Sequence, residues 1–200
     1  PLMASLVADD RIYSIGEGLL GPDFFLDVTE GWRHTGTTTW HGGGRFAERL
    51  PDIKISFYIE PLIRDTGCLR VVPGSHIRGE PDLLEPLRVV TDTAAQDSKP
   101  YGVPQSELPS VALESRPGDV VVFTESLLHA SFGGSAGRYQ HAMTYVQTPV
   151  QEKDIAQVRG SYERSKYSYR PCKSSINSDN PRIRKLVAPL VEWGFEAHDI

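Results

Sequence analysis

Alternating hydrophobic and polar positions recur along the middle of this chain and predict a series of short β-strands. The clearest alternation covers residues 53–59, Ile-Lys-Ile-Ser-Phe-Tyr-Ile. Further strands are predicted over residues 24–28, 35–41, 68–72, 111–114, 120–123 and 141–146. Residues 120–123 are apolar throughout, so we expect that strand to be buried on both faces. Glycine and proline turns separate the strands, which favours a sandwich or barrel.

Helical patterns occupy the two ends of the chain. One helix is predicted within about the first 20 residues, ending before Gly21-Pro22. Another is predicted over Arg182–Trp193, with Gly194 as its stop and Pro189 as a possible break. Residues 77–110 have no clear period and predict a long loop of the kind that often covers a site. The fold class indicated is an all-β core with flanking α-helices.

Composition narrows the class of protein. The 200 residues, 39% hydrophobic and 24% charged, suit a single domain over residues 1–200 with a substantial core. A net charge of −5 argues against nucleic-acid binding, and no apolar run approaches the ~20 residues that cross a membrane. The start, Pro1-Leu2-Met3-Ala4, has no signal-peptide pattern and does not resemble a natural N-terminus, so we expect missing upstream residues. Cys68 and Cys172 form no disulfide framework, and a cytoplasmic location is expected.

Two histidines stand out by their surroundings. His41 ends a predicted strand and precedes three glycines, so its side chain can face an open cavity. His129 follows the most apolar strand, where the fold should be rigid. Non-haem iron(II) that reacts with oxygen uses imidazole ligands, a carboxylate and open positions. Arg138 follows His129, and a guanidinium is the best partner for a buried carboxylate.

These residues belong to a longer ordered pattern. Its parts are Trp40-His41, Gly67–His76, Gly118–Phe123 and Leu128–Ser131. In this order and spacing they resemble the phytanoyl-CoA dioxygenase family of iron(II)/2-oxoglutarate oxygenases, over about residues 19–146. The resemblance implies a double-stranded β-helix, which is a jelly roll of the cupin-like kind.

The same resemblance implies roles for individual residues. His41 and His129 would bind iron(II). Arg138 would pair with the remote carboxylate of 2-oxoglutarate, and Ser131 would support that carboxylate. O2 would be the second cosubstrate.

The chain departs from the family pattern at one position. The family has His-x-Asp where this chain has His41-Gly42-Gly43. Without the carboxylate, one positive charge and one coordination position are unfilled, and glycine leaves space for chloride or bromide. Known iron/2-oxoglutarate halogenases are similar, with Gly or Ala there. We therefore predict a halogenase that chlorinates an unactivated C–H bond of a small molecule and converts 2-oxoglutarate to succinate, with Gly43 as its catalytic determinant.

Other functions remain open at this point. A hydroxylase could lack the aspartate naturally, with water in the gap, or through replacement of the aspartate by Gly43. A catalytically silent binding protein of the same fold and an unrelated cupin-like metal enzyme are further alternatives. Glu48 is the nearest downstream carboxylate that could act as a ligand instead.

Other histidines compete for these roles. His34 also has glycine two places on, although the tryptophan before His41 and the downstream strand match the family better. His76 follows a Pro-Gly turn and is expected to be structural. His141 and His198 are expected to be structural or exposed.

Residues 159–170 mix basic and aromatic side chains. A solvated loop is the simpler interpretation. The functional alternative is a lid in which Arg159, Arg164 and Lys166 bind substrate by charge and stacking. That alternative predicts an anionic substrate that is phosphorylated, carboxylated or nucleotide-like.

Overall fold

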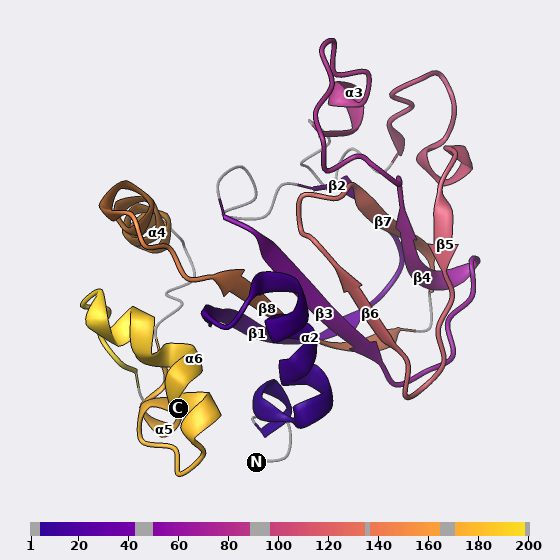
Figure 1. Cartoon of the computed structure of the whole chain (residues 1–200). Helices are drawn as coiled ribbons and strands as arrows, with labels where there is room; N and C mark the ends of the chain where they lie inside the picture. The colour runs from indigo at the N-terminus through magenta and orange to yellow at the C-terminus, as the bar shows by residue number, and fades with distance from the viewer. Residues whose placement is uncertain (1–4, 43–49, 89–96, 135–136, 165–170, 199–200) are drawn as a thin grey trace. The chain divides into compact units, whose positions relative to one another are not determined.

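The computed structural model describes residues 5–42, 50–88, 97–134, 137–164 and 171–198, with the side chain of residue 164 excepted. Figure 1 labels most of its elements. In chain order they are η1 (Leu6–Ala8), α2 (Asp10–Leu20), β1 (Phe24–His34), β2 (Thr38–His41), β3 (Asp52–Tyr58), β4 (Thr66–Val71), α3 (Glu85–Arg88), η3 (Gln105–Glu107), β5 (Val111–Leu113), β6 (Val120–Phe123), β7 (His129–Gly133), β8 (Arg138–Gln147), α4 (Glu152–Arg164), α5 (Lys173–Ile176) and α6 (Pro181–Glu192).

The strands form two four-stranded sheets, in the orders β1-β8-β3-β6 and β2-β7-β4-β5. The β2–β7, β4–β7, β4–β5 and β3–β6 pairs are antiparallel. This arrangement confirms the predicted all-β core with flanking helices. Among the described residues, no helix combines the length and the apolar character that crossing a membrane requires.

The chain divides into two compact units by its internal contacts. The first comprises Pro1–Thr29, Arg49–Ile53 and Met143–Ile200, and the second comprises Glu30–Glu48 and Lys54–Ala142. The helices at the two ends of the chain belong to the first unit, and β2, β4, β5, β6 and β7 belong to the second.

In the first unit, both predicted terminal helices are confirmed. Asp9 caps α2 by accepting a hydrogen bond from the backbone N–H of Arg11 at 3.0 Å. Helix α6 continues through Pro189, which lies near its C-terminal end. Gly194 has a φ of +85° and ends the helix, as the sequence predicted.

Helix α4 was missed, because residues from 159 onward were interpreted as a solvated loop or a lid and no element was predicted over residues 152–158. Its few apolar side chains nevertheless have helical spacing, and Val158 and Tyr162 are buried. The Tyr162 hydroxyl donates a hydrogen bond to Asp27 Oδ1 at 2.6 Å, also in the first unit. Tertiary contacts therefore stabilise a helix whose average composition is strongly polar.

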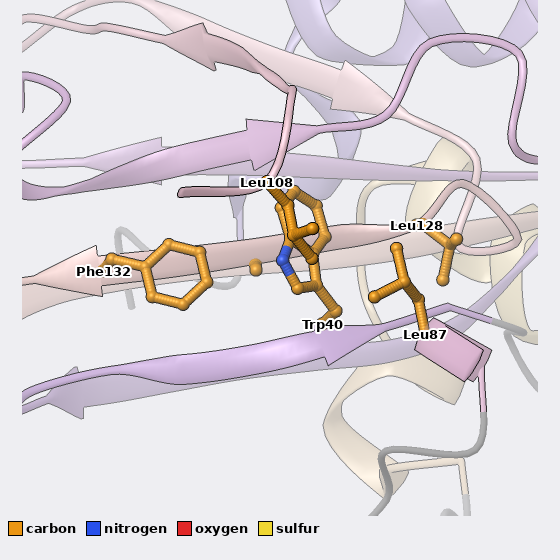
Figure 2. Packing of buried hydrophobic residues seen from close by; sticks show 6 residues of the cluster. Trp40, Leu87, Leu108, Leu128 and Phe132 are labelled. Carbon is orange, nitrogen blue, oxygen red and sulfur yellow. The ribbon is translucent and has the colours of Figure 1, made fainter. Parts of the chain in front are cut away.

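In the second unit, a hydrophobic cluster packs against one face of β2 and β7. It contains Trp40, Leu87, Leu108, Leu128, Ala130 and Phe132. Figure 2 shows Phe132 on one side of Trp40, with Leu87 and Leu128 on the other. Leu87 and Leu108 come from the long excursion 77–110, and the Trp40 indole N–H donates to Gln105 O at 3.0 Å. The described part of the excursion thus covers the Trp40 side of these strands.

One burial prediction was wrong. Strand β6 is not buried on both faces, since Val120 is 37% exposed and Val121 and Val122 are only partly buried. Among the described strands, β6 lies at the edge of its sheet and pairs with β3 alone. An apolar run alone cannot distinguish a central strand from an edge strand.

Candidate functional site

Strands β2 and β7 bring His41 and His129 together as direct partners across the ladder. Their ring centroids are 4.1 Å apart, with 57° between the ring planes. The preceding residues, Trp40 and Leu128, are fully buried in the hydrophobic cluster. Because successive side chains in a strand point to opposite faces, burial of Trp40 turns the His41 imidazole to the other side of β2. His129 begins β7 directly after Leu128, and its ring lies beside that of His41.

Backbone carbonyl groups fix the tautomer of both imidazoles. Nδ1 of His41 lies 2.8 Å from Thr39 O, and Nδ1 of His129 lies 2.7 Å from Leu127 O. A carbonyl oxygen only accepts, so each Nδ1 carries the hydrogen and each Nε2 of the neutral ring keeps a lone pair. This is the form in which imidazole binds a metal ion.

Burial favours the neutral form of both rings. It lowers the pKa of His129 to about 3, with a further contribution from the nearby His41. His41 is exposed as a whole residue, yet burial of its imidazole is the main cause that lowers its pKa. Two neutral imidazoles side by side are a donor set that fits iron(II), whose remaining positions would then be filled by other ligands.

The third ligand position lies outside the described residues, as do Gly43 and Glu48. Within the described residues, no group of three or more His, Cys, Asp and Glu side chains could hold a metal ion. Gly42 is described, and a Cβ there would lie 3.1 Å from the carbonyl oxygens of Ser126 and Leu127. Glycine at position 42 therefore lets the backbone after His41 lie close to the segment before His129.

Arg138 begins β8 and is only 3% exposed. Nη1 donates to Gly36 O at 3.0 Å, and Nη2 donates to Ser131 Oγ. Burial lowers the pKa of Arg138, but a guanidinium stays protonated in proteins. Among the described residues no carboxylate forms an ion pair with it. A buried cation without a counter-charge fits an anionic ligand.

These residues line one cavity of about 220 Å³ in the second unit. The lining residues are Glu30, Trp32, His34, Thr38, His41, Lys54, Tyr58, Leu69, Phe123, His129, Ala130, Ser131, Arg138 and Gln140. The predicted set of His41, His129, Ser131 and Arg138 is therefore brought together.

Sequence interpretation missed several residues of the cavity, above all Lys54 and Tyr58. The alternation over 53–59 was recognised, and it places Lys54 and Tyr58 on one face of β3. Polar residues at alternate positions of a confident strand could have marked that face as the lining of a site. The partner of Lys54 on β1 and that of Tyr58 on β8 could not be identified without the sheet order.

The geometry supports His41 over His34 as a metal ligand. Nε2 of His34 lies 2.9 Å from Gln140 Oε1, and this oxygen accepts, so that nitrogen carries a hydrogen. The Gln140 amide nitrogen in turn donates to Tyr58 OH at 3.2 Å. His76 is exposed and does not line the cavity. His141 stacks on Phe57 at a centroid distance of 6.4 Å.

The predicted substrate-binding residues lie on or beyond α4. The solvated-loop interpretation is wrong for residues 159–164, which are helical. Nε of Arg159 donates to Trp193 O at 3.0 Å, within the first unit. The side chain of Arg164 and all of Lys166 lie outside the described residues. Substrate binding by this segment stays a prediction.

The double-stranded β-helix holds the histidine pair, Ser131 and Arg138 around one cavity, in the arrangement of a candidate non-haem metal site. Residues 31–141 match the family model described as phytanoyl-CoA dioxygenase (PhyH). The chain belongs to this family of iron- and 2-oxoglutarate-dependent enzymes.

Individual relatives agree with this assignment. The chain is 27% identical to the ectoine dioxygenase of Sphingopyxis alaskensis, over 66% of this chain and 49% of that protein. It therefore spans about half the length of this curated relative.

Two solved structures confirm the fold. HygX from Streptomyces hygroscopicus, with nickel and 2-oxoglutarate bound, has a TM-score of 0.57 at 23% identity, covering 74% of this chain and 66% of HygX. EctD from S. alaskensis, with bound Fe, has a TM-score of 0.53 at 23% identity, covering 72% of this chain and 52% of EctD.

Proposed function

We propose that this chain carries an iron(II)/2-oxoglutarate-dependent oxygenase that hydroxylates a small molecule. The observation that carries this proposal is the pair His41 and His129 in one cavity with the buried Arg138, which has no carboxylate partner among the described residues. One relative, EctD, has been solved with 2-oxoglutarate and 5-hydroxyectoine. This likeness favours hydroxylation as the reaction class.

Each described residue has a distinct task in this proposal. The Nε2 atoms of His41 and His129 would hold the iron, and Arg138 with Ser131 would hold the remote carboxylate of 2-oxoglutarate. When bound, iron and 2-oxoglutarate supply the oxidising chemistry with O2. The protein positions them: the carbonyls of Thr39 and Leu127 orient the imidazoles.

Halogenation is the second candidate, and Gly43 favours it. Glycine supplies no ligand, so iron(II) with two neutral imidazoles and one chelating carboxylate keeps an uncompensated positive charge. Chloride or bromide could satisfy both the charge and the open position. In the hydroxylase, water would fill that position.

The two reactions give different products in one assay. Protein with iron(II), 2-oxoglutarate, O2, chloride and a panel of small molecules is analysed by mass spectrometry. Hydroxylation adds one oxygen whether or not chloride is present, whereas halogenation gives a chlorine isotope pattern. In a halogenase, Gly43→Asp abolishes chlorination because the carboxylate occupies the halide position. If no compound of the panel leads to succinate formation, a catalytically silent binding protein is favoured instead.

Gly67 offers a test of the Arg138 position. It has a φ of +93°, and a Cβ there would lie 2.8 Å from Arg138 Nη1. We expect Gly67→Ala to displace the guanidinium and raise the Kd for 2-oxoglutarate roughly tenfold, since small misplacements of positioned groups are costly. Titration calorimetry with Mn(II) in place of iron, under anaerobic conditions, measures this change.

Gly118→Ala is the matched control. Gly118 has a φ of +102°, but a Cβ there would meet nothing within 4 Å. Both substitutions should lower the free energy of unfolding by about 1–2 kcal/mol through backbone strain. Only Gly67→Ala should weaken 2-oxoglutarate binding. An equal loss of affinity in the two variants would mean that strain, and not contact with Arg138, is responsible.

A further inference from the structure

A lysine with two carboxylate partners lies in the second unit. Lys54 Nζ is 2.9 Å from Glu30 Oε2 and 3.2 Å from Glu125 Oε1. The three side chains are only 17%, 19% and 20% exposed. Two carboxylates and one ammonium leave this group with a charge of about −1.

The group borders the proposed metal site. Glu30 and Lys54 line the cavity that holds His41 and His129, whereas Glu125 does not line it. The charge of Lys54 is one of the causes that lower the pKa of both histidines, after burial in each case. A substrate placed for oxidation beside the two imidazoles would therefore face Glu30 and Lys54.

Trp32 adds an aromatic surface on the same side. It is two residues from Glu30 on β1, so both side chains point to one face of the strand. Trp32 lines the cavity and remains 51% exposed. A tryptophan face attracts organic cations, and a neighbouring carboxylate strengthens that attraction.

The charge of the Lys54 group is negative only because Glu125, outside the cavity lining, is its second carboxylate. Arg138 is assigned to the cosubstrate carboxylate, so among the described residues the other charged side chains that line the cavity are Glu30 and Lys54, and the Glu30 carboxylate is the one that a bound cation can contact directly. We propose that the substrate carries an organic ammonium group, which binds between the Trp32 ring and the Glu30 carboxylate. This inference rests on the proposed function, and it is an alternative to the sequence-based prediction of an anionic substrate, which stays a prediction.

Three probes of one size test the charge preference: n-butylammonium, n-butanol and butyrate. Each is titrated under anaerobic conditions into protein loaded with Mn(II) and 2-oxoglutarate. Broadening of the probe's NMR signals by Mn(II) reports binding near the metal. We expect n-butylammonium to bind about tenfold more tightly than n-butanol, and butyrate to bind most weakly, because cation–π and charge contacts add on the order of 1.4 kcal/mol.

Two variants locate the ammonium group. Glu30→Gln should weaken n-butylammonium binding about tenfold and leave n-butanol unchanged. Trp32→Leu should also reduce the preference for the cation. Glu125→Gln is the matched control: it removes one carboxylate from the same lysine, but outside the cavity lining, and should change binding less than about threefold.

Several results would overturn the inference. They are butyrate binding as tightly as n-butylammonium, Glu30→Gln and Glu125→Gln having equal effects, or Trp32→Leu retaining the full preference. 2-Oxoglutarate binding in the same samples separates this inference from the proposed function. Intact 2-oxoglutarate binding without a preference for the cation refutes only the ammonium site. Absence of 2-oxoglutarate binding refutes the proposed function itself.

Discussion

Arg138→Gln is expected to raise the Kd for 2-oxoglutarate by about 100-fold or more. Arg138 is 3% exposed, and its guanidinium is held by Gly36 O and Ser131 Oγ. Truncating one partner of a buried, hydrogen-bonded charge pair costs about 2–5 kcal/mol, and each 1.4 kcal/mol is a factor of ten. Anaerobic titration calorimetry with Mn(II)-loaded protein measures the change.

Two further variants show whether the loss of 2-oxoglutarate affinity comes from the missing guanidinium of Arg138. Arg138→Lys keeps the charge but loses the fork of donors, so its affinity should lie between those of the wild type and Arg138→Gln. Arg116→Gln removes an exposed arginine that does not line the cavity, and should have no effect. Unchanged 2-oxoglutarate affinity in folded Arg138→Gln would show that the cosubstrate carboxylate binds elsewhere.

His129→Ala is expected to abolish stoichiometric iron(II) binding. Only two imidazoles are proposed as protein ligands. Removing one of them should therefore lower the affinity for iron(II) by more than the 10–100-fold that follows the loss of an outer hydrogen-bond partner. His41→Ala should have a similar effect, since the two rings are adjacent, with centroids 4.1 Å apart. Anaerobic equilibrium dialysis against iron(II), with metal analysis of the protein, measures the bound fraction.

His76→Ala and His34→Ala serve as controls for this result. His76 is exposed and away from the cavity lining. His34 lines the cavity, but its Nε2 is engaged by Gln140 Oε1. If iron binding survives in His129→Ala and is lost in His34→Ala, the proposed pair of metal ligands, His41 and His129, is wrong.

Much of the fold could be predicted from local pattern. The alternation over residues 53–59 corresponds to β3, and the helical spacing after residue 181 corresponds to α6. The adjacency of His41 and His129 followed from the family resemblance. The structure supplies its physical cause, the antiparallel pairing of β2 with β7 that makes His41 and His129 direct partners.

The rest depends on contacts between distant segments. The pairing of Glu30 and Glu125 with Lys54 requires the sheet order β1-β8-β3-β6, which no local pattern encodes. The exposure of Val120 follows from the edge position of β6 in that order. Helix α4 was missed because tertiary burial of Val158 and Tyr162 outweighs its polar composition.

The most direct test of the central claim is a crystal structure with Mn(II) or iron(II) and 2-oxoglutarate, in which anomalous scattering locates the metal. We predict one metal ion within about 2.0–2.3 Å of Nε2 of both His41 and His129, with a carboxylate of 2-oxoglutarate paired to Arg138. A metal ion bound without these two imidazoles, or a 2-oxoglutarate away from Arg138, would contradict the account.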